Sequence, residues 1–310
     1  MESADRSPGG VRWRRVVLTP RRLELWTTPG RAGAAAARIL YQPRRRTGVA
    51  GAALTRLLPA RSVRALPARD VAVVAEHVAA LAGVRFDAAA ALHARESGRW
   101  LFALTNADGS GIVVKVGDVG DEGLEREAAT LTALGPRVAA LELPRLRWQG
   151  VDDGRFAIAT DLLRRRPART EADLEDARAA ACALAATARG FVVHGDLAPW
   201  NIVPTNGGIA LVDWEDSRFE EDPLYDLAHY VTRAGALLHA WHPDGAVAHL
   251  TQPGSAGWRY LAEIDLDPEQ ASQHVERYLR RAGSQNSSAP LRRYEAAMTE
   301  ALESHSARRR

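Results

Sequence analysis

The chain of 310 residues contains a single cysteine, Cys182. One cysteine cannot form a disulfide within the chain, and it cannot alone build a cysteine-rich zinc or iron–sulfur site. No run of about 18 apolar residues occurs, and arginines occupy the N-terminal stretch where a secretory signal would need apolar residues. We therefore expect a folded cytoplasmic protein with neither a membrane anchor nor an export signal.

Acidic residues are scarce in the first part of the chain. The net charge is +3, but residues 1–65 hold 14 arginines against 3 acidic residues. Such a basic stretch is compatible with nucleic-acid binding. It lacks interleaved stacking aromatics and matches no known nucleic-acid motif, so solvated arginines are the favoured interpretation.

Lysine is the scarcest basic residue. Of the 41 lysines and arginines only Lys115 is a lysine, and it lies inside the apolar run 112–116, which is typical of a strand. A chain that uses arginine for every other positive charge indicates that this position needs an ammonium group, which is a compact point charge on a flexible stem. An unpaired charge inside a strand would be costly, so Lys115 is a candidate binding residue.

Segments rich in glycine, proline and arginine divide the chain into three parts. Residues 1–67 form a basic extension of unclear role, residues 68–163 a first lobe, and residues 164–310 a second lobe that begins at the arginine-rich linker 164–167. The extension has strand-like pieces at 16–18 and 38–41. The first lobe contains a helix over 69–82, a meander of strands at 89–95, 100–106 and 111–116, a helix over 122–134, and a strand pair at 145–150 and 155–160. A helix over 171–189, with Thr170 as N-cap and Gly190 as its end, opens the second lobe.

The helix over 122–134 carries a carboxylate on its apolar stripe. Glu127 follows Leu124 by three residues and precedes Leu131 by four, so it shares their face. A buried carboxylate needs a partner, and Lys115 on the preceding strand is the candidate. The alternative is a glutamate at the edge of the stripe that reaches solvent.

The stretch with the most chemistry lies between residues 191 and 215. Two apolar runs, 201–203 and 209–212, flank Asn206-Gly207-Gly208 and predict a hairpin, which would bring Asn201 and Asp213 together at its open end. Asp196 lies in the loop just before the hairpin. An amide and two carboxylates would form an oxygen-rich site of the kind that magnesium prefers.

These motifs resemble a known family. His194-Gly195-Asp196, Asn201 five residues after the aspartate, and Asp213-Trp214-Glu215 are similar to the catalytic and metal motifs of the aminoglycoside phosphotransferase and choline kinase-like family. Asp222-Pro223-Leu224-Tyr225-Asp226-Leu227-Ala228 is similar to the pattern that opens a helix in the same family. The resemblance covers roughly residues 85–230. It implies an α+β, two-lobed protein kinase-like fold, with a small antiparallel-sheet N-lobe that binds nucleotide and a mainly helical C-lobe that binds the acceptor.

The resemblance also implies roles for individual residues. Asp196 would orient the acceptor hydroxyl and take its proton, while Asn201 and Asp213 would hold Mg²⁺ across the phosphates of ATP or GTP. Lys115, paired with Glu127, would contact the nonreacting phosphates. The supporting residues would be His194, which would brace the loop, Glu215 of the second motif, and Asp226, which would hold the loop through its backbone N–H groups.

The sequence departs from the family pattern at the turn that covers the phosphates. This turn has only Gly98, with Arg99 beside it, so Arg99 could contact a phosphate instead. The function implied is transfer of a γ-phosphate to a hydroxyl of a small acceptor, such as an amino sugar, an amino alcohol or a sugar. The alternative is a catalytically weak, nucleotide-binding regulatory module that uses its basic N-terminal segment to engage an anionic partner.

The charge of the second lobe bears on the acceptor. Residues 171–270 hold 17 acidic against 5 basic side chains, which favours a cationic acceptor through long-range attraction. A solvated acidic surface explains the same count. Trp200, Trp241 and Trp258 could stack on a sugar or cap an amine, or could belong to the core.

Overall fold

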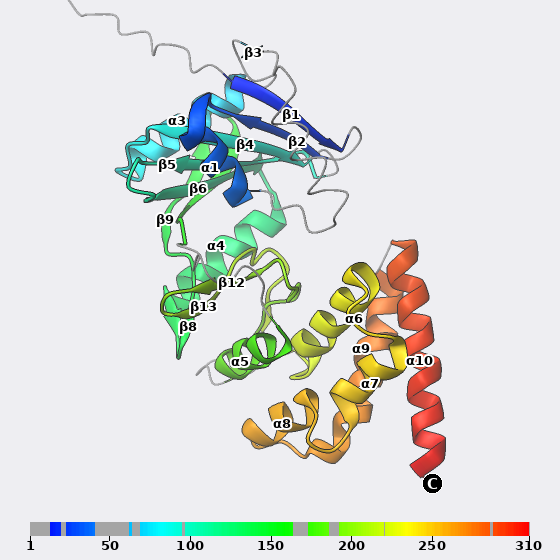
Figure 1. Ribbon diagram of the computed structural model, residues 1–310. Helices are drawn as coiled ribbons and strands as arrows, with labels where there is room; N and C mark the ends of the chain where they lie inside the picture. The colour runs from blue at the N-terminus through cyan, green and yellow to red at the C-terminus, as the bar shows by residue number, and fades with distance from the viewer. Residues whose placement is uncertain are drawn as a thin grey trace, which may run out of the picture. The chain divides into compact units, whose positions relative to one another are not determined.

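The computed structural model describes residues 13–19, 23–40, 62–63, 69–94, 97–163, 173–185, 192–219, 221–285 and 288–309. The chain divides into two compact units, shown in Figure 1, and we describe each by itself. The first unit comprises Met1–Leu124 and Arg145–Leu162, and the second comprises Glu125–Pro144 and Leu163–Arg310.

The first unit is built on an antiparallel sheet whose described strands follow the order β3-β1-β2-β4-β5-β6-β10-β9. The predicted meander and strand pair are confirmed, because β4, β5 and β6 are neighbours and β10 pairs with both β6 and β9. The bounds are β1 Trp13–Thr19, β2 Leu23–Thr27, β3 Ser62–Val63, β4 Ala88–Ala94, β5 Arg99–Thr105, β6 Gly111–Asp118, β9 Leu146–Asp152 and β10 Arg155–Asp161.

Two helices pack on this sheet through different sets of side chains. Helix α3 (Arg69–Leu81) packs its valines against a cluster that includes Ala89 and Ala91, whereas α1 (Gly30–Leu40) packs Ala36 and Ala37 against a cluster that includes Ala90. Successive residues of a strand point to opposite faces, so the run of alanines in β4 serves both helices. The predicted helix over 69–82 is confirmed.

The strand predicted at 38–41 is wrong, because residues 38–40 lie in α1. Residue 41 lies outside the described residues. The alanines of residues 34–37 favour a helix, and the Arg38 side chain donates a hydrogen bond to the Ala34 carbonyl one turn back. The strand predicted at 16–18 is confirmed as part of β1, which pairs with β2 and so joins the sheet. Strands from the range 1–67 therefore extend the sheet of the first unit.

The second unit combines short sheets with helices. Helix α4 (Glu122–Leu134) runs into it from the first unit, as predicted. One sheet has the order β12-β13-β8-β7, and β11 pairs with β14. The bounds are β7 Arg137–Val138, β8 Leu141–Glu142, β11 Val192–Val193, β12 Ile202–Thr205, β13 Gly208–Leu211, β14 Arg218–Phe219, α5 Leu174–Ala185, α6 Tyr225–Leu238, α7 Pro243–Thr251, α8 Ala256–Glu263, α9 Ala271–Gln285 and α10 Ala289–Arg309, with a 3-10 turn at Pro268–Gln270.

The α+β organisation, with a sheet-based N-terminal unit and a helical C-terminal unit, is therefore confirmed. The predicted helix over 171–189 is present as α5, over a shorter range. Its predicted N-cap Thr170, its predicted end at Gly190 and the linker 164–167 lie outside the described residues. In the part of the chain that the structure describes, none of the helices has both the length and the apolar character that crossing a bilayer requires.

Candidate active site

The predicted hairpin is formed by β12 and β13, with Ile202 opposite Leu211. At its open end the Val212 N–H donates to the Asn201 carbonyl over 3.0 Å, which holds the residues beside Asp213 next to Asn201. Asp213 has a positive φ of 73°. An aspartate held in this left-handed region is typical of a position whose backbone is fixed by its surroundings. The hairpin therefore brings Asn201 and Asp213 together as predicted.

The loop that carries Asp196 is held through its backbone by a buried carboxylate. The two carboxylate oxygens of Asp226 accept hydrogen bonds from the N–H groups of His194, over 2.7 Å, and Gly195, over 3.0 Å. Burial raises the pKa of Asp226 to about 7, while the two N–H groups act to lower it. Gly195 has φ 84°, and a Cβ atom there would lie 1.9 Å from the Asp216 carbonyl oxygen, so the loop requires glycine.

Three side chains contact the carboxylate of Asp196. Asn201 Nδ2 donates to its Oδ2 over 3.0 Å, His229 Nε2 lies 2.9 Å from its Oδ1, and an Arg233 nitrogen lies 3.7 Å from Oδ1. Burial acts to raise the pKa of Asp196, but the hydrogen bond from His229 and the charge of Arg233 outweigh it and hold the pKa below its usual value. Asp196 is therefore ionised at neutral pH and oriented from two sides.

Sequence reasoning missed His229, Arg233 and Tyr278. His229 is buried on α6, and burial lowers its pKa, so its ring is neutral at neutral pH. The Tyr278 hydroxyl of α9 lies 3.4 Å from Nδ1 of this ring. Arg233 Nε donates to His229 Nε2 over 2.9 Å, so this nitrogen lies next to both Arg233 and Asp196. The spacing of four residues between His229 and Arg233 is the one sequence signal that places both on one helix face.

His194 is completely buried and braces the loop against the hairpin. Its Nε2 donates to the Val212 carbonyl over 2.9 Å, and its ring packs against Trp214 with the centroids 4.7 Å apart. Burial lowers its pKa, so the ring stays neutral. Because Nε2 carries the proton, the other nitrogen is unprotonated, and it has no hydrogen-bond partner among the described residues.

A cluster of carboxylates lies next to the hairpin. Carboxylate oxygens of Glu127, Asp213 and Glu215 all lie within 4.8 Å of one another. Two further contacts attach α4 to this loop: Arg126 donates to the Glu215 carbonyl over 2.7 Å, and the Thr130 hydroxyl bonds to the Ser217 hydroxyl over 2.7 Å. Glu127 is 2% exposed, so it is buried as predicted. Hard oxygen donors brought this close fit a divalent cation such as Mg²⁺.

Lys115 belongs to the first unit. It lies in β6 opposite Leu101 of β5 and Ile158 of β10, and only 9% of it is exposed. Glu127 belongs to the second unit, so their predicted ion pair stays a prediction.

The predicted phosphate-covering turn also lies in the first unit. Gly98 is exposed and has φ 70°. The Arg99 guanidinium binds the Asp121 carboxylate through two hydrogen bonds of 2.6 Å, and Asp121 accepts the N–H groups of Gly123 and Leu124 at the start of α4. Burial acts to raise the pKa of Asp121, but Arg99 and these N–H groups lower it below its usual value. Arg99 thus fixes the start of α4, and a phosphate contact from it would compete with Asp121.

Comparison with known proteins identifies the family to which the chain belongs. The model described as the phosphotransferase enzyme family matches residues 30–264, which is more than half of the chain. The chain belongs to the phosphotransferase enzyme family. As a member of this family it is a small-molecule phosphotransferase, and the predicted enzyme class, with a hydroxyl group as acceptor, is confirmed. The comparison with curated proteins found no match.

Three of the solved structures similar to this chain are 10–16% identical to it. Aminoglycoside phosphotransferase APH(4)-Ia is 13% identical, with 76% of this chain and 99% of that chain covered and a TM-score of 0.48. A putative fructosamine-3-kinase from Haemophilus somnus 129PT is 10% identical, with 74% and 96% covered and a TM-score of 0.43. Aminoglycoside phosphotransferase APH(3'')-Id from Streptomyces rimosus is 16% identical, with 63% and 90% covered and a TM-score of 0.38.

Proposed function

We propose that this phosphotransferase moves the γ-phosphate of ATP or GTP to a hydroxyl group of a small acceptor. The observation that carries the proposal is the surroundings of Asp196. Its carboxylate is ionised and held by Asn201 over 3.0 Å and by His229 over 2.9 Å, in a loop next to the hairpin that carries Asp213. The acceptor classes expected from the sequence, amino sugars, amino alcohols and sugars, all offer such a hydroxyl.

In the proposed reaction Asp196 acts on the acceptor. Its carboxylate accepts the hydroxyl proton while the hydroxyl oxygen forms a bond to the γ-phosphorus. The bond between that phosphorus and the bridging oxygen breaks, and the nucleoside diphosphate leaves with the electron pair. Because this transition state asks mainly for positioning, a carboxylate whose rotamer is fixed on both sides is suited to the task.

The oxygen ligands near the hairpin suit a metal ion that neutralises the charge of the phosphates. Asp213 and Glu215 present carboxylate oxygens within 4.8 Å of Glu127, and Asn201 can add an amide oxygen. Mg²⁺, when bound, supplies positive charge next to the phosphate oxygens. We assign Asn201 and Asp213 to the metal, and Lys115 with Glu127 to the nonreacting phosphates of the nucleotide.

The test is nucleotide consumption that depends on Mg²⁺, measured for the full chain with a panel of amino sugars, amino alcohols and neutral sugars. The Asp196→Ala variant serves as the blank, because it removes the proton acceptor and leaves the proposed nucleotide ligands in place. We expect one acceptor class to stimulate consumption by the wild type and none to stimulate the variant. Equal stimulation of both proteins would overturn the role given to Asp196.

A further inference from the structure

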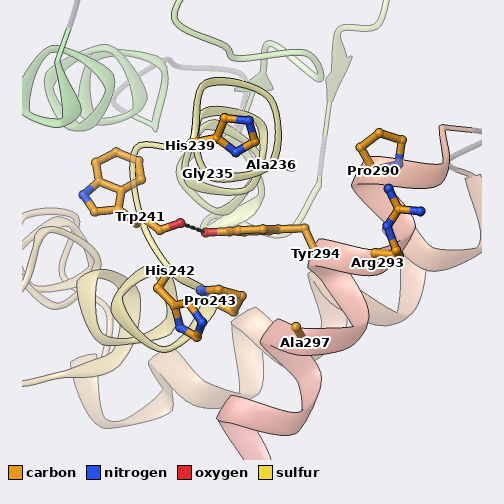
Figure 2. A pocket seen from close by; sticks show the side chains of 10 residues that line it. All are labelled: Gly235, Ala236, His239, Trp241, His242, Pro243, Pro290, Arg293, Tyr294 and Ala297. Carbon is orange, nitrogen blue, oxygen red and sulfur yellow. Dashed lines mark hydrogen bonds between the residues drawn. The ribbon is translucent and has the colours of Figure 1, made fainter.

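A pocket of about 500 Å³ lies in the second unit, between the end of α6, the start of α7 and α10 (Figure 2). We call it the α6/α10 pocket. Tyr294 of α10 extends across it and donates from its hydroxyl to the Trp241 carbonyl over 2.8 Å. This bond connects α10 to the segment between α6 and α7. Trp241 in this segment supplies a second aromatic ring to the lining. The pocket is an open hollow of the surface, because its lining includes the exposed residues His239, His242, Pro290 and Arg293.

One face of α6 connects this pocket with Asp196. His229, Arg233 and Ala236 are four and three residues apart, so they lie along one face of the helix. His229 contacts the Asp196 carboxylate, and Ala236 lines the pocket. Seven residues of α-helix span about 10 Å, so an acceptor of about that length could place a hydroxyl at Asp196 and its other end in the pocket.

The pocket offers hydrogen-bond donors and no carboxylate. Its polar lining side chains are His239, His242, Arg293, Trp241 and Tyr294, and no aspartate or glutamate is among the residues that line it. Asp244 stands outside the lining and lies 3.1 Å from Nδ1 of His242. Because Arg293 is the charged side chain of this lining and no carboxylate accompanies it, the lining favours an anion over an ammonium group.

Some acidic residues of the second unit form ion pairs with arginines. Glu221 pairs with Arg281, and Asp222 lies 2.7 Å from Arg277, so two carboxylates that contribute to the acidic count of residues 171–270 are neutralised by arginines of α9. Glu263 pairs with Arg178 of α5, which is already among the five basic residues of that range. The charge that meets the acceptor depends on the side chains closest to its proposed position, and Arg233 and Arg293 are among these.

We propose that the α6/α10 pocket binds the far end of the acceptor, and that this end combines an aromatic or other flat apolar group with a negative charge. The inference rests on the proposed function, because it takes Asp196 as the place where the acceptor hydroxyl reacts. It narrows that function by selecting against amino sugars and amino alcohols, which would bring an ammonium group to a site lined by donors.

The test measures binding of three matched probes to the full chain by calorimetry, without nucleotide. Phenyl β-D-glucuronide, phenyl β-D-glucoside and phenyl β-D-glucosaminide share a phenyl ring and hydroxyl groups, but carry a carboxylate, no charge and an ammonium group. We expect the glucuronide to bind about tenfold more tightly than the glucosaminide, with the glucoside between them. Equal or tighter binding of the glucosaminide, or binding of none of the three, would overturn the proposal.

Reversing the charge of a lining residue tests whether the probes bind in the α6/α10 pocket. Arg293→Glu should reverse the order of the charged probes, whereas Arg292→Glu makes the same change one residue earlier on α10, at an exposed position outside the lining, and should leave the order unchanged. An equal response of both variants would show a general charge effect and overturn the assignment. Because these measurements need no phosphoryl transfer, failure of the probes to bind is distinguishable from a failure of the proposed function, which would appear as nucleotide consumption that no acceptor stimulates.

Discussion

The two units bury their polar side chains very differently. Among the described residues of the first unit, the buried charged groups are Glu24 and Lys115, in an otherwise apolar sheet core. In the second unit, some buried polar groups, such as His274 and Glu295, lie in α9 and α10. Others are buried around one loop and one hairpin, including Glu127, His194, Asn201, Asp226 and His229. Burying such groups costs free energy unless they are paired, so their concentration marks the place where function has been built. The predictions below test this contrast, from the largest expected effect to the smallest.

Replacing a carboxylate of the second unit should have the largest effect. Asp213→Asn keeps the size of the side chain but removes the negative charge proposed to hold Mg²⁺ beside the phosphates. We expect turnover to fall about a thousandfold, because charge stabilisation of the transition state is lost. The measurement is steady-state nucleotide consumption over a range of Mg²⁺ concentrations. Asp216→Asn, an exposed change in the same loop, is the control, and an equal loss in both variants would contradict the assignment.

The buried lysine of the first unit should come next. Lys115→Arg keeps the positive charge but replaces a compact ammonium group with a broad, flat guanidinium inside a strand that is 9% exposed at this position. We expect kcat/KM for the nucleotide to fall about a hundredfold while the fold survives. Steady-state kinetics measures kcat/KM, and circular dichroism checks that the variant is folded. Activity at the wild-type level would mean that position 115 needs only a positive charge. It would contradict the inference that this position needs an ammonium group.

The buried carboxyl of Asp226 predicts a pH effect on stability. Burial raises its pKa to about 7, above the value of about 3.9 expected in an unfolded chain, so the folded state binds the proton more tightly. This carboxyl therefore stabilises the fold most below about pH 4, and the contribution is lost as the pH rises through about 7. Urea unfolding should show that the stability lost by Asp226→Asn, about 2 kcal/mol at about pH 5, shrinks at about pH 8.

The exposed substitution Glu300→Gln gives the reference for this measurement, since it should show no such trend. A stability gap for Asp226→Asn that widened with rising pH would contradict the prediction. It would mean that the ionised carboxylate, bonded to two backbone N–H groups, is the form that stabilises the loop.

A smaller effect is expected for the histidine that positions Asp196. His229→Ala removes one contact to Asp196 Oδ1. We expect kcat to fall about tenfold with little change in nucleotide affinity, because the carboxylate loses one of its three side-chain contacts. His229→Gln can donate from its side-chain amide and should recover part of the loss. Stopped-flow and steady-state kinetics on both variants check this. A loss of nucleotide affinity without a loss of kcat would assign His229 to a different task.

Local patterns predicted much of the fold and of the site. The hairpin, α3, α4 and the central strands follow from apolar periodicity and turn residues that lie close together in the sequence. Strand β2 was not predicted, because its stability depends on pairing with β4, about 65 residues away in the sequence.

The contacts of the site that sequence reasoning missed are long-range. His229 meets Asp196 across 33 residues and Tyr278 across 49, and no local pattern encodes either contact. The acidic count of residues 171–270 leaves out Arg277 and Arg281 of α9, which pair with two of its acids, and the cationic acceptor that this count favours stays a prediction. Charge counted along a sequence thus differs from charge presented at a site, because ion pairs cancel it locally.

The central claim is that Asp196 accepts the proton of the acceptor hydroxyl while other residues hold the nucleotide. The most direct measurement is transfer of a labelled γ-phosphate by Asp196→Asn in a single turnover, together with its nucleotide affinity. The account predicts an affinity within about threefold of the wild type and a transfer rate lower by about 10² to 10⁴. Transfer at the wild-type rate would contradict it.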